Sequence, residues 1–191
     1  MAYCFEKHFE LRKNHDEDLD HEPQFKATID AIVSQSKKIV CIGWRPDTGY
    51  ALYDYLGTFA KVIVVEAWQS NVTAFNHSSC KIIHGDGLSI FDSTSDTIDC
   101  LIWQDGPEHC KLQDVEAFLQ KAKNRANAII LATPNGYFPQ GAYNGNPWET
   151  HVSTWTRDTY KQFGFEAVEY IAKTPYSNDK KQGLIGYWVR K

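Results

Sequence analysis

The stretch IVCIGWRPDTG, residues 39–49, opens with four apolar residues and continues into a loop that has a glycine at each end. A short apolar run bounded by turn residues is typical of a strand buried inside a sheet. Gly43 and Gly49 can adopt backbone conformations that let a ligand approach the main chain before the next helix begins. The stretch therefore predicts a buried strand that ends in a binding loop.

Four further strand candidates, short and largely apolar, follow this strand and alternate with longer amphipathic segments. They lie at residues 62–65, 81–84, 98–103 and 128–132. Between the last two runs, a helix is predicted by an apolar stripe at Leu112, Val115, Phe118, Leu119 and Ala122. This alternation predicts a parallel sheet with helices on its faces and right-handed crossovers.

The last part of the chain departs from this alternation. Residues 165–172 and 184–189 are strand candidates joined by a polar turn, so they should pair antiparallel. Thr156 is expected to cap the helix before them, and Gly164 to follow its end. The predicted fold is α/β, a Rossmann-like, doubly wound sheet of seven strands that is mostly parallel and ends in an antiparallel hairpin.

The length of the chain, 191 residues, fits one domain better than two. Residues 23–191 are expected to form this domain, beginning with a helix marked by Phe25, Ile29 and Val33. Residues 1–22 mix acidic, basic and histidine residues with few aliphatic ones, which predicts an N-terminal arm that is either solvated or a partly ordered helical cap.

Composition and charge argue against several classes of protein. A formal net charge of −4 does not suit a protein that grips extended nucleic acid. No apolar run approaches about 18 residues, the length that a membrane span needs, and the first residues lack a signal peptide's apolar core. The five cysteines have no C-x-x-C spacing and indicate neither a disulfide framework nor a zinc ribbon: Cys4, Cys41, Cys80, Cys100 and Cys110. We expect a cytoplasmic protein without a membrane segment; the sequence indicates no oligomeric state.

Glycines and polar residues follow the predicted strands at the edge of the sheet where open α/β sheets bind ligands. Glu66 ends the second strand, 23 positions after Gly43, where a carboxylate can accept hydrogen bonds from both hydroxyls of a ribose. Asp86 follows the third strand, where it could bind an adenine amino group. The candidates for cofactor contact are Gly43, Trp44, Gly49, Glu66, Asp86, Gly87 and Gln104.

Together these features resemble the class I S-adenosylmethionine-dependent methyltransferases. In that superfamily a glycine-rich first loop, an acidic end to the second strand and a Gly-Asp after the third hold the cofactor. The resemblance covers about residues 35–191, and the segments GPEH (106–109), TPNG (133–136) and HVSTW (151–155) are similar to a subset of the superfamily. It implies S-adenosylmethionine as cofactor and a small-molecule or nucleotide-like methyl acceptor.

The fourth predicted strand runs into QDGPEH, residues 104–109, which contains D-x-x-E-H. In a helical turn, Asp105, Glu108 and His109 would share one face and could bind a divalent cation. Similar E-x-x-E-H segments bind metal in ubiquinone-pathway O-methyltransferases and small-RNA 2′-O-methyltransferases. The resemblance therefore implies a Mg²⁺ or Mn²⁺ site at Asp105, Glu108 and His109, with Asp105 in place of the first glutamate and His151 as a fourth ligand. Such a metal could lower the pKa of an acceptor hydroxyl.

Two other interpretations fit the same residues. An ordinary helix start would have Asp105 or Gly106 as N-cap, Pro107 in the first turn and Glu108 as reciprocal cap. Alternatively, His109 or His151 acts as a metal-free general base, so that the catalytic candidates are His109, His151 and Asp105.

The breaker-rich segment 134–150 is predicted to be a long loop. It could be a substrate lid whose aromatic and amide side chains contact the acceptor: Asn135, Tyr137, Tyr143, Asn146 and Trp148. Alternatively, it is a structural loop packed by its own aromatic residues.

The sequence thus predicts methyl transfer from S-adenosylmethionine, at oxygen because the N/D-P-P-Y/F motif of amino methyltransferases is absent after the fourth strand. One alternative is a catalytically inactive methyltransferase-fold binding protein, indicated by Cys41 where the family has an acidic residue and by the stretched 43–49 loop. Another is a nicotinamide-dependent reductase, which shares the acidic residue after the second strand but continues with parallel crossovers.

Overall fold

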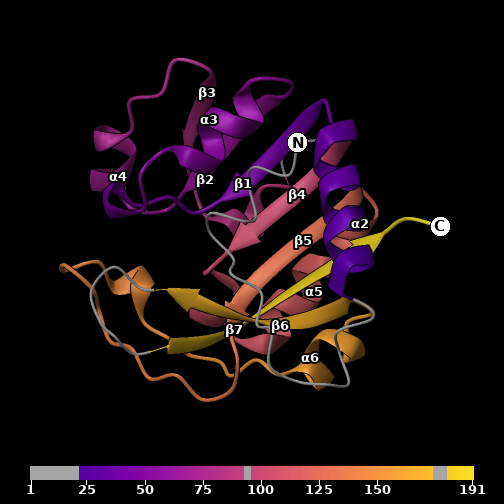
Figure 1. Ribbon diagram of the computed structural model, residues 1–191. Helices are drawn as coiled ribbons and strands as arrows, with labels where there is room; N and C mark the ends of the chain where they lie inside the picture. The colour runs from indigo at the N-terminus through magenta and orange to yellow at the C-terminus, as the bar shows by residue number, and fades with distance from the viewer. Residues whose placement is uncertain (1–21, 93–95, 174–179) are drawn as a thin grey trace.

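Seven strands form one mixed sheet in the order β3-β2-β1-β4-β5-β7-β6 (Figure 1). The strands are β1 (Lys38–Ile42), β2 (Lys61–Glu66), β3 (Cys80–His84), β4 (Ile98–Gln104), β5 (Ala126–Pro134), β6 (Glu166–Lys173) and β7 (Lys180–Val189). The computed structural model describes residues 22–92, 96–173 and 180–191. The predicted N-terminal arm, apart from Glu22, and most of the predicted turn before β7 lie outside these residues.

The pairing of the strands confirms the predicted α/β fold. β1 pairs parallel with β2 and with β4, while β7 runs antiparallel to both β5 and β6. Each predicted strand is present, and the largest difference is at β7, which begins at Lys180 rather than at residue 184. The terminal hairpin removes the parallel continuation that a nicotinamide-dependent reductase would have, so that alternative is wrong.

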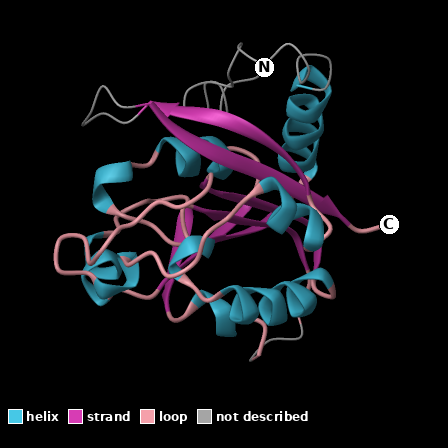
Figure 2. Ribbon diagram, turned by 90° about the horizontal axis from the view of Figure 1, so that it is seen from below, coloured by secondary structure: helices cyan, strands magenta, loops and turns pink. Residues whose placement is uncertain are grey.

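Helices cover both faces of the sheet (Figure 2). They are α2 (Glu22–Gln35), α3 (Ala51–Gly57), α4 (Gln69–Ala74), α5 (Leu112–Lys123) and α6 (Arg157–Gln162). Thr156 caps α6 by accepting a hydrogen bond from the Thr159 N–H, and Gly164, at φ 75°, follows the end of the helix as predicted. α6 thus starts and stops where local sequence signals place it.

Alternate residues of the strands enter two separate cores. Val40 and Ile42 of β1 pack on the side of α5 and α6, whereas Ile39 and Cys41 pack on the side of α2 and α3. This period of two is the geometry of a strand that is buried on both faces. Cys41 is 2% exposed, so the position acts as a small apolar core residue.

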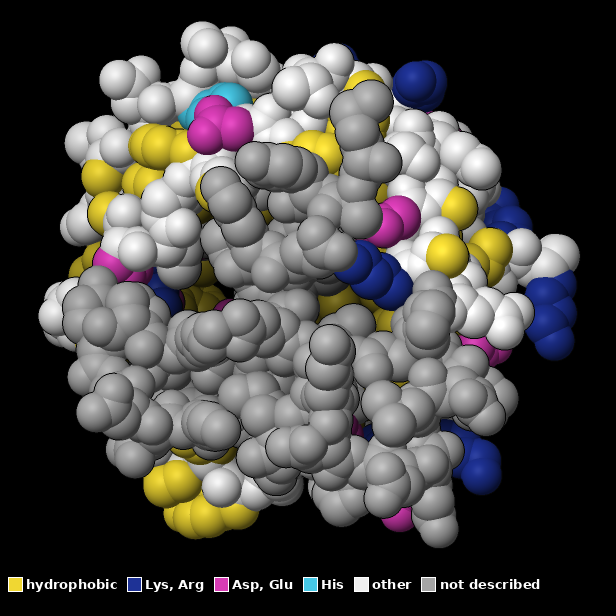
Figure 3. Space-filling model, viewed as in Figure 1, with side chains coloured by type: hydrophobic (Ala, Val, Ile, Leu, Met, Phe, Trp, Pro, Cys, Tyr) yellow, Lys and Arg dark blue, Asp and Glu magenta, His cyan; other side chains and the backbone are white. Residues whose placement is uncertain are grey.

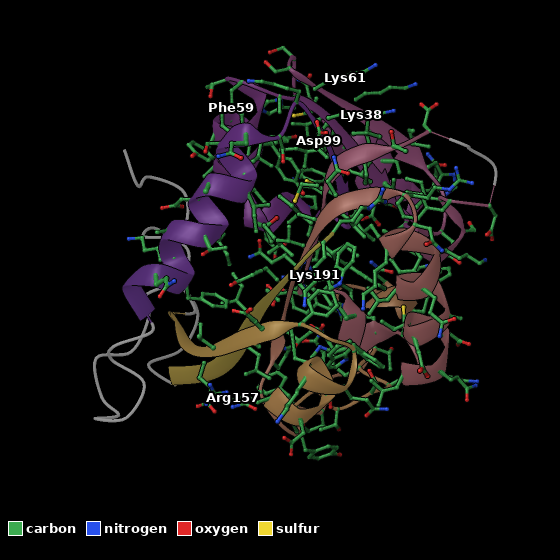
Figure 4. All side chains as sticks on the ribbon, turned by 90° about the vertical axis from the view of Figure 1, so that its right-hand side faces the viewer. Lys38, Phe59, Lys61, Asp99, Arg157 and Lys191 are labelled. Carbon is green, nitrogen blue, oxygen red and sulfur yellow. The ribbon has the colours of Figure 1, made fainter. Side chains whose placement is uncertain are left out.

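The amino edge of the sheet is held by Asp99, near the start of β4. Its Oδ2 accepts hydrogen bonds from the backbone N–H groups of Lys37 and Lys38, at 2.8 and 2.9 Å. Figure 4 shows Lys38, Lys61 and Asp99 at this same edge. The pair of bonds fixes β1 against β4 at the end opposite to the predicted ligand site.

The described surface carries charges of both signs. On the face seen in Figure 3, basic side chains lie mostly toward the right of the view, one lies near the middle, and acidic side chains are scattered among them. Within the described residues there is no helix with the length and apolarity to cross a membrane.

Candidate functional site

β1 and β4 are neighbours at the centre of the sheet, and the chain leaves them toward opposite edges. Such a topological switch point opens a crevice beyond the carboxyl ends of the strands. A cavity of about 190 Å³ lies there. All seven predicted cofactor residues line this one cavity: Gly43, Trp44, Gly49, Glu66, Asp86, Gly87 and Gln104.

The loop after β1 has a fixed shape. Gly43 lies at φ 83° and donates its N–H to the Val65 carbonyl at 2.8 Å, and Gly49 lies at φ 67°. Between them, a 3-10 turn, η1 (Pro46–Thr48), accounts for the stretched length of the loop. The buried Trp44 indole donates to the Gly49 carbonyl at 3.1 Å, which ties the two ends of the loop together.

Glu66 joins this loop to the end of β2. The side chain is 6% exposed, and its Oε2 accepts from the Trp44 N–H at 2.8 Å while Oε1 accepts from the Trp68 N–H at 2.7 Å. Burial raises the pKa of Glu66, and the two backbone hydrogen bonds oppose that rise. Each carboxylate oxygen has further lone-pair capacity, so a ribose could still donate to both.

The turn after β3 presents Asp86 to the same cavity. Asp86 Oδ1 accepts from the Leu88 N–H at 2.9 Å and so caps a 3-10 turn, η2 (Gly87–Ser89). A Cβ at Gly87 would overlap the side chain of Ile42, so only glycine lets this turn pack against β1. The cap uses Oδ1 alone, so Oδ2 of Asp86 can accept a hydrogen bond from a ligand.

A sharp turn after β4 brings Asp105 and His109 into the cavity. Asp105 has a positive φ of 46°, which is rare outside glycine and is often found at functional sites. It is followed by a short 3-10 turn, η3 (Pro107–His109), with Gly106 as N-cap and Pro107 in first position. Gly106 and Pro107 occupy the positions expected if this segment is an ordinary helix start, but the turn is separate from α5.

Glu108 does not act as the predicted reciprocal cap of a helix. Its side chain is 3% exposed, and Oε2 is buried without a hydrogen-bond partner. A buried, unpartnered carboxylate oxygen costs about 1–3 kcal/mol or more, so a site that keeps one calls for an explanation other than helix capping.

Glu108, His109 and His151 form a cluster in which the possible ligand atoms lie within 4.8 Å of one another. His151 Nδ1 is 2.6 Å from the Phe138 carbonyl oxygen, and His109 Nδ1 is 3.3 Å from that of Thr150. A carbonyl only accepts, so His151 Nδ1 carries the proton and Nε2 is the basic nitrogen of its neutral ring. The His109 ring also interacts with the backbone of Asp105. His151 Nε2 lies 3.9 Å from Glu108 Oε1.

The surroundings of the cluster favour its neutral forms. Burial, and then the charge of Asp105, raise the pKa of Glu108 well above its usual range. Burial lowers the pKa of His109, against the opposing charge of Glu149. Asp105, predicted as a ligand, is not part of this cluster; it lines the cavity beyond the strand ends instead.

A second cavity, of about 660 Å³, meets the cluster from the other side. It is lined by His151 together with Tyr137, Phe138, Val152 and Lys111 among others, whereas His109 lines the first cavity. The cluster therefore stands between the two cavities.

Three of the five predicted lid residues line one of the two cavities, whereas Asn135 and Tyr143 line neither. Tyr137, 81% exposed, lines the second cavity, while Asn146 and Trp148 line the first. The segment is anchored because the Val152 and Ser153 N–H groups donate to the Glu108 carbonyl at 2.9 and 3.1 Å. The exposed Tyr137 shows that the loop is not packed by all of its own aromatic residues.

Sequence reasoning missed Arg45 and Glu149, both of which line the first cavity. Arg45 Nη1 donates to Glu149 Oε2 at 2.7 Å, which links the loop after β1 to the long loop after β5. The two residues are 104 positions apart, so no local pattern in the sequence pairs them.

No family model and no curated protein sequence matches the chain. Among solved structures, it is similar to a SAM-dependent methyltransferase from Archaeoglobus fulgidus, with 12% identity, a TM-score of 0.58, and coverage of 91% of this chain and 100% of the other. The methyltransferase domain of bacterial CtHen1-CN has 16% identity, a TM-score of 0.54 and coverages of 90% and 99%. Magnesium protoporphyrin IX methyltransferase from Synechocystis PCC 6803, with bound SAH, has 13% identity, a TM-score of 0.56 and coverages of 91% and 84%. The chain therefore has the fold of the SAM-dependent methyltransferases.

Proposed function

We propose that this protein transfers the methyl group of S-adenosylmethionine to a hydroxyl of a small-molecule or nucleotide-like acceptor. The observation that supports the proposal most is that Gly43, Glu66 and Asp86, from three separate strand ends, line one cavity. The fold agrees with it, since similar structures are methyltransferases and one of them holds SAH.

The cavity suits the charge of this cofactor. Its lining includes four carboxylates, Glu66, Asp86, Asp105 and Glu149. S-adenosylmethionine carries a positive sulfonium and a positive α-ammonium, and fixed negative groups in a water-poor site stabilise such charges. In this arrangement Glu66 accepts from the ribose hydroxyls and Asp86 Oδ2 from the adenine amino group.

Methyl transfer from a sulfonium is an in-line displacement, so the main task of the protein is alignment. The bond from sulfur to the methyl carbon breaks as the acceptor oxygen bonds that carbon, and the sulfonium becomes a neutral thioether. The acceptor's proton leaves to a base. We place the acceptor in the second cavity, with its hydroxyl directed between His151 and His109. The neutral ring of His151 can take the proton at Nε2.

The cluster fits a divalent cation. It offers one carboxylate with an unpartnered buried oxygen and two imidazoles, of which that of His151 donates its Nδ1–H to a backbone carbonyl, an arrangement that orients metal-binding histidines. In this alternative to a metal-free base, Glu108, His109 and His151 would hold the metal, and the two rings would no longer be free to take a proton. Of Mg²⁺ and Mn²⁺, the two imidazoles favour Mn²⁺. A bound metal would lower the pKa of an acceptor hydroxyl and fix its position.

The metal proposal is tested by thermal unfolding with MnCl₂ or MgCl₂. We expect Mn²⁺ to raise the melting temperature of the wild-type protein and to have no such effect on Glu108→Gln, because the variant loses the only carboxylate of the cluster. Glu116→Gln, on the exposed face of α5, is the matched control and should respond like the wild type. An equal response of all three proteins would refute the metal site.

The enzymatic proposal is tested by incubating the purified protein with S-adenosylmethionine carrying a labelled methyl group and a mixture of hydroxylated metabolites. Mass spectrometry of the products should show the label on an oxygen of an acceptor. If the protein binds the cofactor but transfers no label to any acceptor class, the alternative of an inactive binding protein is favoured.

A further inference from the structure

The lining of the first cavity includes the basic side chain of Arg45 beside several carboxylates. Among the described residues that line it, Arg45 is the only arginine or lysine, against Glu66, Asp86, Asp105 and Glu149. An anionic ligand group that enters this cavity is repelled by the carboxylates and can form an ion pair with Arg45 alone.

The Arg45 guanidinium is held in a defined orientation. Nη1 donates to Glu149 Oε2 at 2.7 Å, Nε lies 3.3 Å from Asp47 Oδ1, and the group lies over the ring of Tyr143 at 5.1 Å from its centroid. Among the described residues, no hydrogen bond uses Nη2. Burial opposes the charge of Arg45, but Glu149 and Asp47 hold its pKa above the ordinary value, so the side chain stays a cation.

The position of Arg45 corresponds to one end of the proposed cofactor. Glu66 and Asp86, assigned to the adenosine, belong to the ends of β2 and β3, on one side of the switch point. The methionine end must then extend toward the loop after β1 and the turn after β4. Arg45 belongs to that loop, and Asp105 of the turn after β4 is near enough to raise its pKa.

We propose that Arg45 binds the α-carboxylate of the cofactor's methionine portion. This inference rests on the proposed function. The carboxylate is the one anionic group of S-adenosylmethionine, and a planar guanidinium pairs with a carboxylate through two parallel hydrogen bonds. Arg45 thereby distinguishes a cofactor with the complete amino acid from adenosyl compounds that lack the carboxylate.

Calorimetric titration with two ligands tests the assignment. S-adenosylhomocysteine carries the carboxylate, and its decarboxylated analogue lacks only that group. The wild type should bind S-adenosylhomocysteine more tightly. Arg45→Met should weaken S-adenosylhomocysteine binding by about tenfold or more while changing the affinity for the decarboxylated analogue by less than about twofold.

Two further variants make the result decisive. Arg45→Lys keeps the charge but loses the fork of donors, so it should retain part of the preference for the carboxylated ligand even if Arg45→Met folds poorly. Arg157→Met, an equal charge change on α6 (Figure 4), should bind both ligands like the wild type.

Three outcomes would overturn the assignment. The first is a wild type that binds both ligands equally well. The second is an Arg45→Met or Arg45→Lys variant that loses affinity for both ligands by the same factor. If the wild type binds neither ligand, the proposed cofactor is wrong as well, which separates failure of the function from failure of the Arg45 assignment.

Discussion

Single residues set the shape of the site where the backbone has no room for a side chain. Gly106 is the sharpest case, because a Cβ there would overlap the indole of Trp103, which is itself 3% exposed and lines the cavity. The indole cannot move without disturbing the core beneath it. The turn that presents Asp105 and Glu108 therefore depends on glycine at this position.

Gly106→Ala should lower the free energy of unfolding by about 1–3 kcal/mol through overpacking. Urea denaturation of the purified variant measures this loss. Gly141→Ala is the matched control, since a Cβ at Gly141 meets no atom within 4 Å and its φ is not positive. Equal stabilities of the two variants would show that the turn rearranges without cost.

At the scale of elements, strands and helices were predictable because their signals are local. The apolar run of β1, the stripe of α5 and the Thr156 cap are each contained in one short segment of the chain. The η3 turn was not predicted as a separate element, because Pro107 suits the first turn of a 3-10 and of an α-helix equally well. Its connection to residues 152–153 crosses more than forty positions and leaves no local pattern.

The hydrogen bonds of Asp99 at the amino edge of the sheet should contribute to stability but not to ligand binding. Asp99→Ala leaves the N–H groups of Lys37 and Lys38 without their acceptor and should cost about 1–3 kcal/mol of unfolding free energy in urea denaturation. Asp96→Ala, which removes an exposed ion pair with Lys38, should change the stability much less. Both variants should bind S-adenosylhomocysteine like the wild type, because the site lies at the opposite edge. A loss of binding in Asp99→Ala without unfolding would contradict this separation.

At the scale of the whole molecule, the sheet topology brings distant residues together. The rule that ligands bind beyond the carboxyl ends of strands at a switch point was enough to place Gly43, Glu66, Asp86 and Gln104 around one cavity. The rule did not predict that Arg45 and Glu149 also line the cavity, because their contact depends on the path of the loop after β5. Long loops have many possible paths, so their contacts with the site require coordinates.

The convergence of these strand ends on an adenosyl group is tested most directly by calorimetric titration of the wild type, Glu66→Gln and Glu116→Gln with S-adenosylhomocysteine. The account predicts saturable binding to one site in the wild type and in the Glu116→Gln control. Glu66→Gln should bind at least about tenfold more weakly, because the amide cannot accept from both ribose hydroxyls. Absence of binding by the folded wild type, or equal affinity in all three proteins, would contradict it.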